Sequence, residues 1–273
     1  MTGPVWDGQG VDPWLPERLA RDARVAAAER DVYRVLWAEL SAWIVKVRRA
    51  VQPSASVPPD PMAVWAFVPD WEALVARFVT GPILDVMGLA FQAIFGDDYE
   101  WDHRPGVAAH LASVTNRMVR TPDEVFNLVA TAVAEGAGNG EGIPDLAKRV
   151  DRILSTTETE KWPNRAVVVA RTETLGALNA GREEAFHAVA EDLGGEFELM
   201  WLATADSRTR PTHLAADGQR VPLGSPFTVG EATLARPGDP SGPANEVIQC
   251  RCTTLLLRPG EDVDLSDRQF DGW

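Results

Sequence analysis

The stretch Asp192-Leu-Gly-Gly-Glu-Phe-Glu-Leu-Met-Trp-Leu202 decides the class of fold. Upstream of it, apolar residues recur at helical spacing from about Pro163 to Asp192, which predicts one long helix. The two adjacent glycines end that helix, because glycine readily adopts the backbone angles found just beyond helix ends. From Phe197 onward alternate residues are apolar, which is the pattern of a strand. The chain therefore changes from helical to strand periodicity at this point.

The first half of the chain is predicted to be helical. Apolar residues follow helical spacing over residues 15–51, 69–95 and 143–155. Thr121-Pro-Asp-Glu124 combines a cap, a proline and acids, which predicts a further helix that ends within residues 136–142. The prolines of residues 52–61 predict an extended connector, and Gly81-Pro82 predicts a break or kink.

The region after residue 196 is predicted to hold short strands and turns. A second strand is expected over residues 247–257, Asp217-Gly218 is expected to close a tight hairpin, and Pro237-Gly238 fits a type II turn. The fold class is therefore α+β: a helical N-terminal region, then a compact α+β domain with a long helix and a small, mostly antiparallel sheet. The expected divisions are an N-terminal arm (1–14), a helical region (15–142), the α+β domain (143–258) and an acidic tail (259–273).

Composition excludes several classes of protein. The 273 residues carry a net charge of −14, which argues against coating nucleic acid or anionic membrane by bulk attraction. No apolar run is seen to approach the ~18 residues of a membrane span, and the N-terminus lacks a signal-peptide pattern. The two cysteines are separated by a single residue, which excludes a disulfide framework.

Candidate site residues are densest between Asp206 and Cys252. His213, Cys250 and Cys252 supply three of the four ligands that zinc takes, with Asp206 or Asp217 as a possible fourth. The alternative is a pair of buried reduced thiols beside a packing histidine, which we favour because the fourth ligand is undefined. For Asp206 we favour an Asx turn, in which the carboxylate accepts from nearby backbone N–H groups.

The segment Arg171-Thr172-Glu173 lies within the predicted long helix and admits two interpretations. Its charged residues could anchor the helix to other elements, or they could belong to a transferase site. We favour anchoring, because the chain contains no glycine-rich phosphate loop, no G-x-S-x-G elbow and no H-E-x-x-H motif. No catalytic residue is assigned, and nothing in the sequence requires an enzyme.

Two further groups of residues could contact partners. Trp6 and Trp14 stand in a polar arm and are candidate anchors for a partner surface. Local basic groups could touch DNA, although solvated helix faces are the more common explanation. These groups are Arg18, Arg21 and Arg24, and Lys46, Arg48 and Arg49.

Taken in order, these motifs resemble the phage Mu F-like minor head protein (phage head morphogenesis) domain. The resemblance covers about residues 145–258, and Gln249 stands where the family usually has asparagine. It rests on Ala170-Arg171-Thr172-Glu173-Thr174, Trp201, Asp206, Arg208, Thr209, Arg210, His213, Asp217-Gly218, Phe227, Pro237-Gly238-Asp239-Pro240 and Cys250-Arg251-Cys252-Thr253.

The resemblance implies a minor capsid protein of a tailed double-stranded DNA bacteriophage. Such a protein associates with the portal, acts in procapsid assembly, DNA packaging or ejection, and lies inside the capsid near the portal vertex after assembly in the bacterial host cytoplasm. Implied partners are the portal protein, other head proteins and packaged DNA, with no membrane. The resemblance implies no cofactor. Zinc binding stays an open alternative that rests on the cysteines and not on the resemblance.

Three alternatives remain open at this stage. One is a metal-dependent nucleic-acid hydrolase around His213, Asp206 and the cysteines. Another is an ADP-ribosyltransferase-like enzyme that uses Arg171 and Glu173. The third is a small DNA-binding module.

Overall fold

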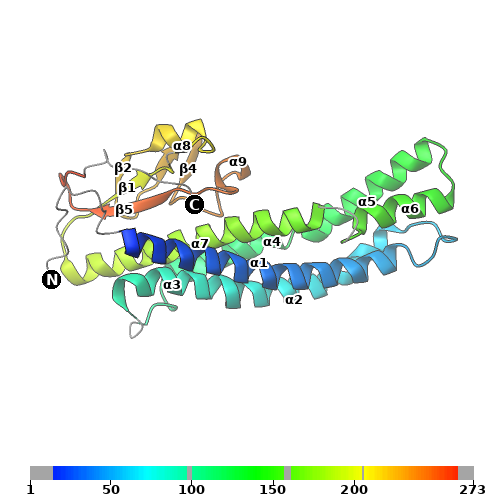
Figure 1. The fold of residues 1–273 in the computed structure, drawn as a ribbon, viewed down its shortest axis with the longest axis horizontal. Helices are drawn as coiled ribbons and strands as arrows, with labels where there is room; N and C mark the ends of the chain where they lie inside the picture. Colours follow the sequence, from blue (N-terminus) through cyan, green and yellow to red (C-terminus); the bar gives the residue numbers. More distant parts are fainter. Residues whose placement is uncertain (1–14, 97–99, 157–160, 205, 264–273) are drawn as a thin grey trace.

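The computed structural model describes residues 15–96, 100–156, 161–204 and 206–263, and the side chains from residue 23 onward within them. The protein is an elongated bundle of helices with a small α+β layer at one end (Figure 1). The α+β class predicted from the sequence is thus confirmed. Trp6 and Trp14, and the tail beyond residue 263, lie outside the described residues.

Long helices build most of the described chain. α1, α3 and α7 run along the bundle, and the α5–α6 hairpin lies at the end opposite the sheet (Figure 1). The helices are α1 (Leu15–Val51), α2 (Val68–Phe78), α3 (Leu84–Phe95), α4 (Pro105–Met118), α5 (Thr121–Gly138), α6 (Ile143–Leu154) and α7 (Lys161–Leu193), with a 3₁₀ helix η1 (Pro61–Phe67) and a π-helical turn η2 (Val79–Ile83).

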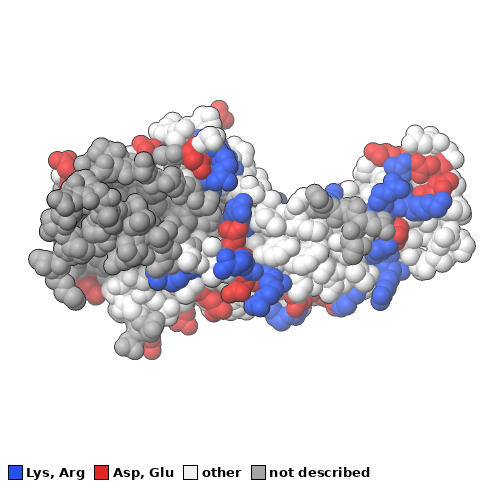
Figure 2. Space-filling model, in the orientation of Figure 1, with Lys and Arg blue, Asp and Glu red and all other residues white. Residues whose placement is uncertain are grey.

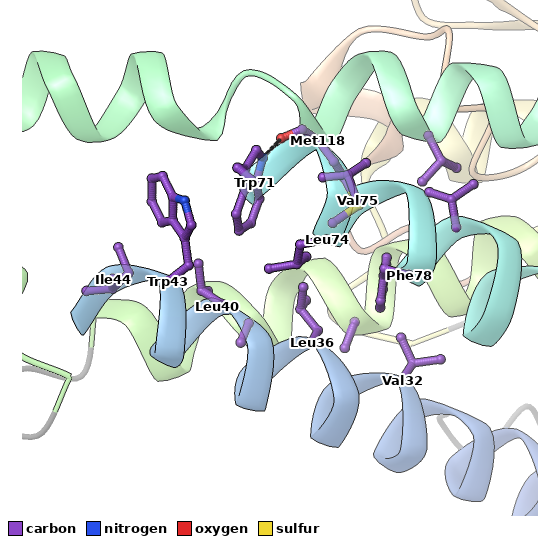
Figure 3. Close-up of a cluster of buried hydrophobic side chains, with 14 of the residues drawn as sticks. Val32, Leu36, Leu40, Trp43, Ile44, Trp71, Leu74, Val75, Phe78 and Met118 are labelled. Atoms are coloured by element: carbon purple, nitrogen blue, oxygen red, sulfur yellow. Dashed lines mark hydrogen bonds between the residues drawn. The ribbon is translucent and has the colours of Figure 1, made fainter. Parts of the chain in front are cut away.

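Apolar side chains at helical spacing on α1 form the seam of the main core. Figure 3 shows Trp43 of α1 and Trp71 of α2 facing each other, with ring centroids 5.1 Å apart. The buried indole N–H of Trp71 donates to the backbone oxygen of Met118 at 2.9 Å, so this polar group is satisfied inside the core. The α1 seam comprises Ala28, Val32, Leu36, Leu40, Trp43, Ile44, Val47 and Val51.

The helix predictions are largely confirmed, with two corrections. α4 was not predicted from the sequence. Thr121 does not cap α5: its hydroxyl donates back to the Met118 oxygen at 3.1 Å, and the residue before the helix is Arg120. The helix nevertheless begins there, because Pro122 and the acids behind it suit a first turn.

The expected break at Gly81-Pro82 is a single π-helical turn. Pro82 lacks the N–H that an α-helical hydrogen bond needs, and the wider turn accommodates it without ending the helix. Residues 61–95 therefore continue as one helical run through η1, α2, η2 and α3.

This run, Pro61–Phe95, is long and apolar enough by composition to cross a membrane, with a mean hydropathy of 1.6. The expectation that no apolar run approaches such a length is therefore wrong. The run packs along α1 and α7, where Trp71, Val75, Ile83 and Met87 are buried in the main core. Buried core helices of soluble proteins pass the same test, so this is weak evidence for a membrane span.

A three-stranded antiparallel sheet, in the order β2-β1-β5, lies over the C-terminal half of α7 (Figure 1). Its central strand buries both faces: Leu199 and Trp201 face one cluster of side chains, and Met200 and Leu202 face another. The strands are β1 (Glu198–Leu202), β2 (Arg220–Pro222), β3 (Phe227–Val229), β4 (Ala232–Leu234) and β5 (Thr253–Leu257); β3 and β4 form a separate hairpin.

Two predictions for this layer are wrong. Asp217-Gly218 does not close a hairpin but ends a short helix, α8 (Pro211–Ala216), where Gly218 takes a left-handed φ of 75°. The strand expected over residues 247–257 begins only at Thr253, because α9 (Ala244–Val247) and an irregular segment precede it.

The domain boundary at residues 142/143 stays a prediction. Leu154, Trp162, Ala166 and Ala170 belong to the same core as α1 and α2, whereas Phe186 packs with the sheet. The long helix α7 therefore takes part in both cores.

Candidate functional site

Three consecutive residues of α7 each hold a different part of the fold. Arg171 pairs with Glu29 of α1 at 3.0 Å. The Thr172 hydroxyl accepts from the Gln249 backbone N–H at 3.0 Å, and Glu173 pairs with Arg117 of α4. Because neighbouring helical residues point in different directions, this short motif can join α7 to three elements.

The Glu173 carboxylate is fully enclosed in this network. Burial raises its pKa, and the Arg117 guanidinium partly opposes that rise. The side chain of Glu173 is 4% exposed, against 29% for Arg117. Arg117 is therefore the single described counter-charge that opposes the effect of burial on this carboxylate.

His213 of α8 lies against both cysteines. Its Nδ1 atom is 3.3 Å from the Cys252 sulfur and 3.7 Å from the Cys250 sulfur, and all three side chains are buried. Contact with Cys252 lowers the pKa of Cys250, and contact with Cys250 raises that of Cys252.

Glu246 of α9 holds the other side of the imidazole. Its carboxylate oxygen lies 3.1 Å from His213 Nε2 and accepts from the Thr212 hydroxyl at 2.8 Å. An ionised carboxylate can only accept a hydrogen bond, so it favours the tautomer in which Nε2–H donates to Glu246 and the Nδ1 lone pair points at the sulfurs. Glu246 could not be predicted as a site residue, because no motif spacing links it to His213.

Asp206 forms the expected Asx turn and does more. Its carboxylate accepts from the Arg208 backbone N–H at 2.9 Å and takes both guanidinium nitrogens of Arg251, at 2.5 and 2.6 Å. The bidentate Arg251 contact holds the pKa of Asp206 well below its usual range. Arg208 adds a more exposed contact to the same carboxylate at 3.3 Å.

Neither Asp206 nor Asp217, the two proposed fourth zinc ligands, belongs to the thiol–imidazole group formed by His213, Cys250 and Cys252. Asp206 is bound by Arg251, and Asp217 accepts from the Ala203 backbone N–H at 2.9 Å. Arg210 donates to the Ile248 backbone oxygen, so it braces the segment that precedes Cys250. The remaining motif residues therefore stabilise the loops around the cluster.

Residues 249–252 are docked directly on α7. Asn179 donates to the Cys252 and Pro237 backbone oxygens, each at 3.0 Å. Gln249 adopts a left-handed φ of 55°, which side chains such as Gln disfavour and Asn tolerates. This backbone angle gives a physical reason for asparagine at that position in the family that the sequence resembles.

The turn at Pro237-Gly238-Asp239 also fastens the layer to α7. Gly238 has a φ of 75°, and the Asp239 N–H donates to the Arg236 oxygen at 3.2 Å, as in the expected type II turn. An added Cβ at Gly176 of α7 would lie 2.9 Å from the Gly238 oxygen. Asp239 in turn accepts from the Ala235 and Ser241 backbone N–H groups.

The buried His110 of α4 should make stability depend on pH. Burial, reinforced by Arg236 and Arg117, lowers its pKa to about 3, and only Asp239 acts in the opposite direction. Below pH ~6.5 this histidine is protonated in the unfolded chain but stays neutral in the folded chain. The free energy of unfolding therefore falls by about 1.4 kcal/mol per pH unit as the pH drops from ~6.5 toward the folded pKa.

Urea unfolding of the wild type and of His110→Gln between pH 7 and pH 4 measures this effect. The variant should lose stability less steeply as the pH falls. His103→Gln, at an exposed histidine, is the matched control and should keep the wild-type slope. Equal slopes for His110→Gln and the wild type would contradict the assignment.

Comparison with known proteins finds one family for the part of the chain that holds the motif residues. The family model described as "Phage Mu protein F like protein" matches residues 127–255. No solved structure matches the chain.

Curated relatives are matched over part of their length. The chain is 28% identical over 138 residues to the minor head protein GP7 of Bacillus phage SPP1, covering 50% of this chain and 42% of that protein. It is 28% identical over 170 residues to NAD(+)--arginine ADP-ribosyltransferase EFV of Enterococcus faecalis, covering 59% and 34%. An uncharacterized protein of Haemophilus influenzae is 31% identical over 133 residues, covering 49% and 24%.

The chain thus spans less than half the length of each of these relatives. The family match begins in α5 and ends in β5, and so contains all the motif residues from Arg171 to Cys252. Residues 127–255 of this chain therefore match the phage Mu F-like family, and this match together with the likeness to the SPP1 minor head protein supports the resemblance that the sequence motifs indicated.

Proposed function

We propose that this chain is a minor head protein of a tailed double-stranded DNA bacteriophage, and that it binds the portal protein during procapsid assembly. The family of residues 127–255 and the likeness to the SPP1 minor head protein support the head role. The structural observation that carries it is the use of the family motif: Arg171, Glu173 and Asp206 are each held in an internal ion pair. These three residues therefore hold elements of the fold together, which favours a structural role for the motif over a catalytic one.

The predicted partner-binding helices offer a suitable apolar surface. Leu89 and Ile94 of α3 are 44% and 42% exposed, beside a groove between α1, α3 and α7. Arg24 and Arg182 also line this groove. It therefore suits an apolar segment of the portal protein that carries acidic residues.

Co-expression with the portal protein encoded by the same phage tests both parts of this proposal. The tagged wild-type chain should retain the portal protein, and the double variant Leu89→Asp/Ile94→Asp should not. Leu214→Asp, at a leucine of α8 that is 48% exposed, is the matched control and should bind as the wild type does. A wild-type chain that retains no portal protein would contradict portal association, and equal binding by the double variant would contradict this surface.

A location inside the capsid and a role in DNA packaging or ejection belong to the same proposal. Direct attraction to DNA has less support, because Lys46 and Arg48 pair with Asp70 and Asp151. Figure 2 shows basic and acidic side chains next to one another in the middle of the visible face and at its right-hand end. Any DNA contact would therefore be local.

The enzymatic alternatives have weaker support. The likeness to the ADP-ribosyltransferase spans 34% of that protein. Arg171 and Glu173, the residues considered for such a site, lie in separate ion pairs to α1 and α4. For a hydrolase, Asp206 lies outside the thiol–imidazole group and is bound by Arg251.

A further inference from the structure

The cluster of His213, Cys250 and Cys252 has the shape of a metal site. Its three ligand atoms lie within 4.8 Å of one another. A tetrahedral zinc ion with ordinary bond lengths would place a nitrogen and a sulfur ligand about 3.6 Å apart. The two Nδ1–sulfur distances, 3.3 and 3.7 Å, lie on either side of that value.

Glu246 supplies the second observation that points to a metal. Histidine ligands of zinc characteristically donate their other ring N–H to a carboxylate, which fixes the tautomer and the ring orientation. Glu246 occupies this position at Nε2, and its side chain is 7% exposed. A histidine packed for its bulk alone would not need a buried carboxylate behind it, because burying that charge costs free energy.

The surroundings favour zinc over a disulfide. Cysteines separated by one residue would close a strained ring, so oxidation is disfavoured. Thiolate and imidazole ligands together suit zinc. On binding, the two thiols release their protons and the imidazole coordinates in its neutral form.

We propose that His213 Nδ1 and the sulfurs of Cys250 and Cys252 bind one zinc ion, with Glu246 as the positioning residue and water as the fourth ligand. The site joins α8 to the segment between α9 and β5. That segment is already docked on α7 through Thr172 and Asn179. The zinc ion therefore locks the α+β layer onto the long helix. This inference does not depend on the proposed head role.

Metal analysis of the full chain tests the proposal. Protein expressed with added zinc and purified under reducing conditions should contain one zinc per chain. Cobalt substituted for zinc should give the visible absorption of tetrahedral coordination together with thiolate-to-cobalt charge transfer. Both signals should disappear in Cys252→Ser.

A second variant is needed, because misfolding of Cys252→Ser would also abolish both signals. Glu246→Gln should keep the fold and weaken zinc about 10–100-fold in competition with a chelator. His110→Gln, at the other buried histidine of the described residues, should keep the wild-type zinc affinity. A folded wild-type chain that takes up neither zinc nor cobalt would overturn the proposal, as would unchanged affinity in Glu246→Gln.

Discussion

Replacing Arg117 with methionine should destabilise the fold by about 3–5 kcal/mol, because it leaves the buried Glu173 carboxylate without a counter-charge. Without Arg117, the pKa of Glu173 rises further above its unfolded value. An acid with a raised folded pKa loses stability as pH rises above the unfolded pKa. The loss should therefore be larger at pH 8 than at pH 5 in urea unfolding measurements.

Arg171→Met is the matched control, since it breaks the neighbouring ion pair of the same motif. The Arg171 and Glu29 side chains are 38% and 27% exposed, so water can solvate the remaining charge. The expected cost is about 1 kcal/mol or less, with little dependence on pH. Equal losses in the two variants would show that burial of Glu173 is not what makes Arg117 important.

Gly181→Ala should destabilise the fold by about 1–3 kcal/mol or more, because α3 and α7 pack backbone against backbone there. An added Cβ would lie 2.1 Å from the Met87 oxygen and 2.8 Å from its carbonyl carbon. The two helices would have to separate along a well-packed core. The gain in helix propensity, about 1 kcal/mol, offsets only part of this cost.

Gly138→Ala provides the comparison at the end of α5. No atom outside its neighbours lies within 4 Å of an added Cβ at that position, and the residue is exposed. The substitution should be neutral or should stabilise the protein by up to about 1 kcal/mol. Thermal unfolding of both variants measures the difference, and a Gly181→Ala protein as stable as the wild type would contradict the close approach of α3 and α7.

The longest helices of the fold could be predicted from the spacing of apolar residues. α1 and α7 bury long stripes of apolar residues, so their periodicity predicted them to within a few residues at most of their ends. α4 was missed because a buried histidine, His110, stands in its stripe between Val107 and Val114. A polar residue there weakens the pattern, although tertiary contacts stabilise the helix.

The strand layer was predicted less well, because pairing partners lie far apart in sequence. The alternation over residues 197–202 predicted β1, which is the central strand. Residues 248–252 look like strand in the sequence, but their backbone follows α7, where Thr172 and Asn179 supply the hydrogen bonds. Local sequence does not contain that information.

Contacts between distant residues also limited how much of the candidate site could be predicted. His213 and the two cysteines were grouped correctly, although the cysteines lie outside a strand. Glu246 and Arg117 could not be assigned, because each meets its partner only after the chain has folded. Asp206 and Asp217 were candidate ligands by residue type, and the fold gives both of them backbone partners instead.

Quantitative mass spectrometry of purified virions tests the head-protein role most directly. The phage that encodes this chain should carry it in mature particles at a far lower copy number than the major coat protein, and disrupting its coding sequence should reduce the yield of infectious particles. The role would be contradicted if wild-type particles lack the chain and if the phage with the disrupted coding sequence gives a normal yield of infectious particles.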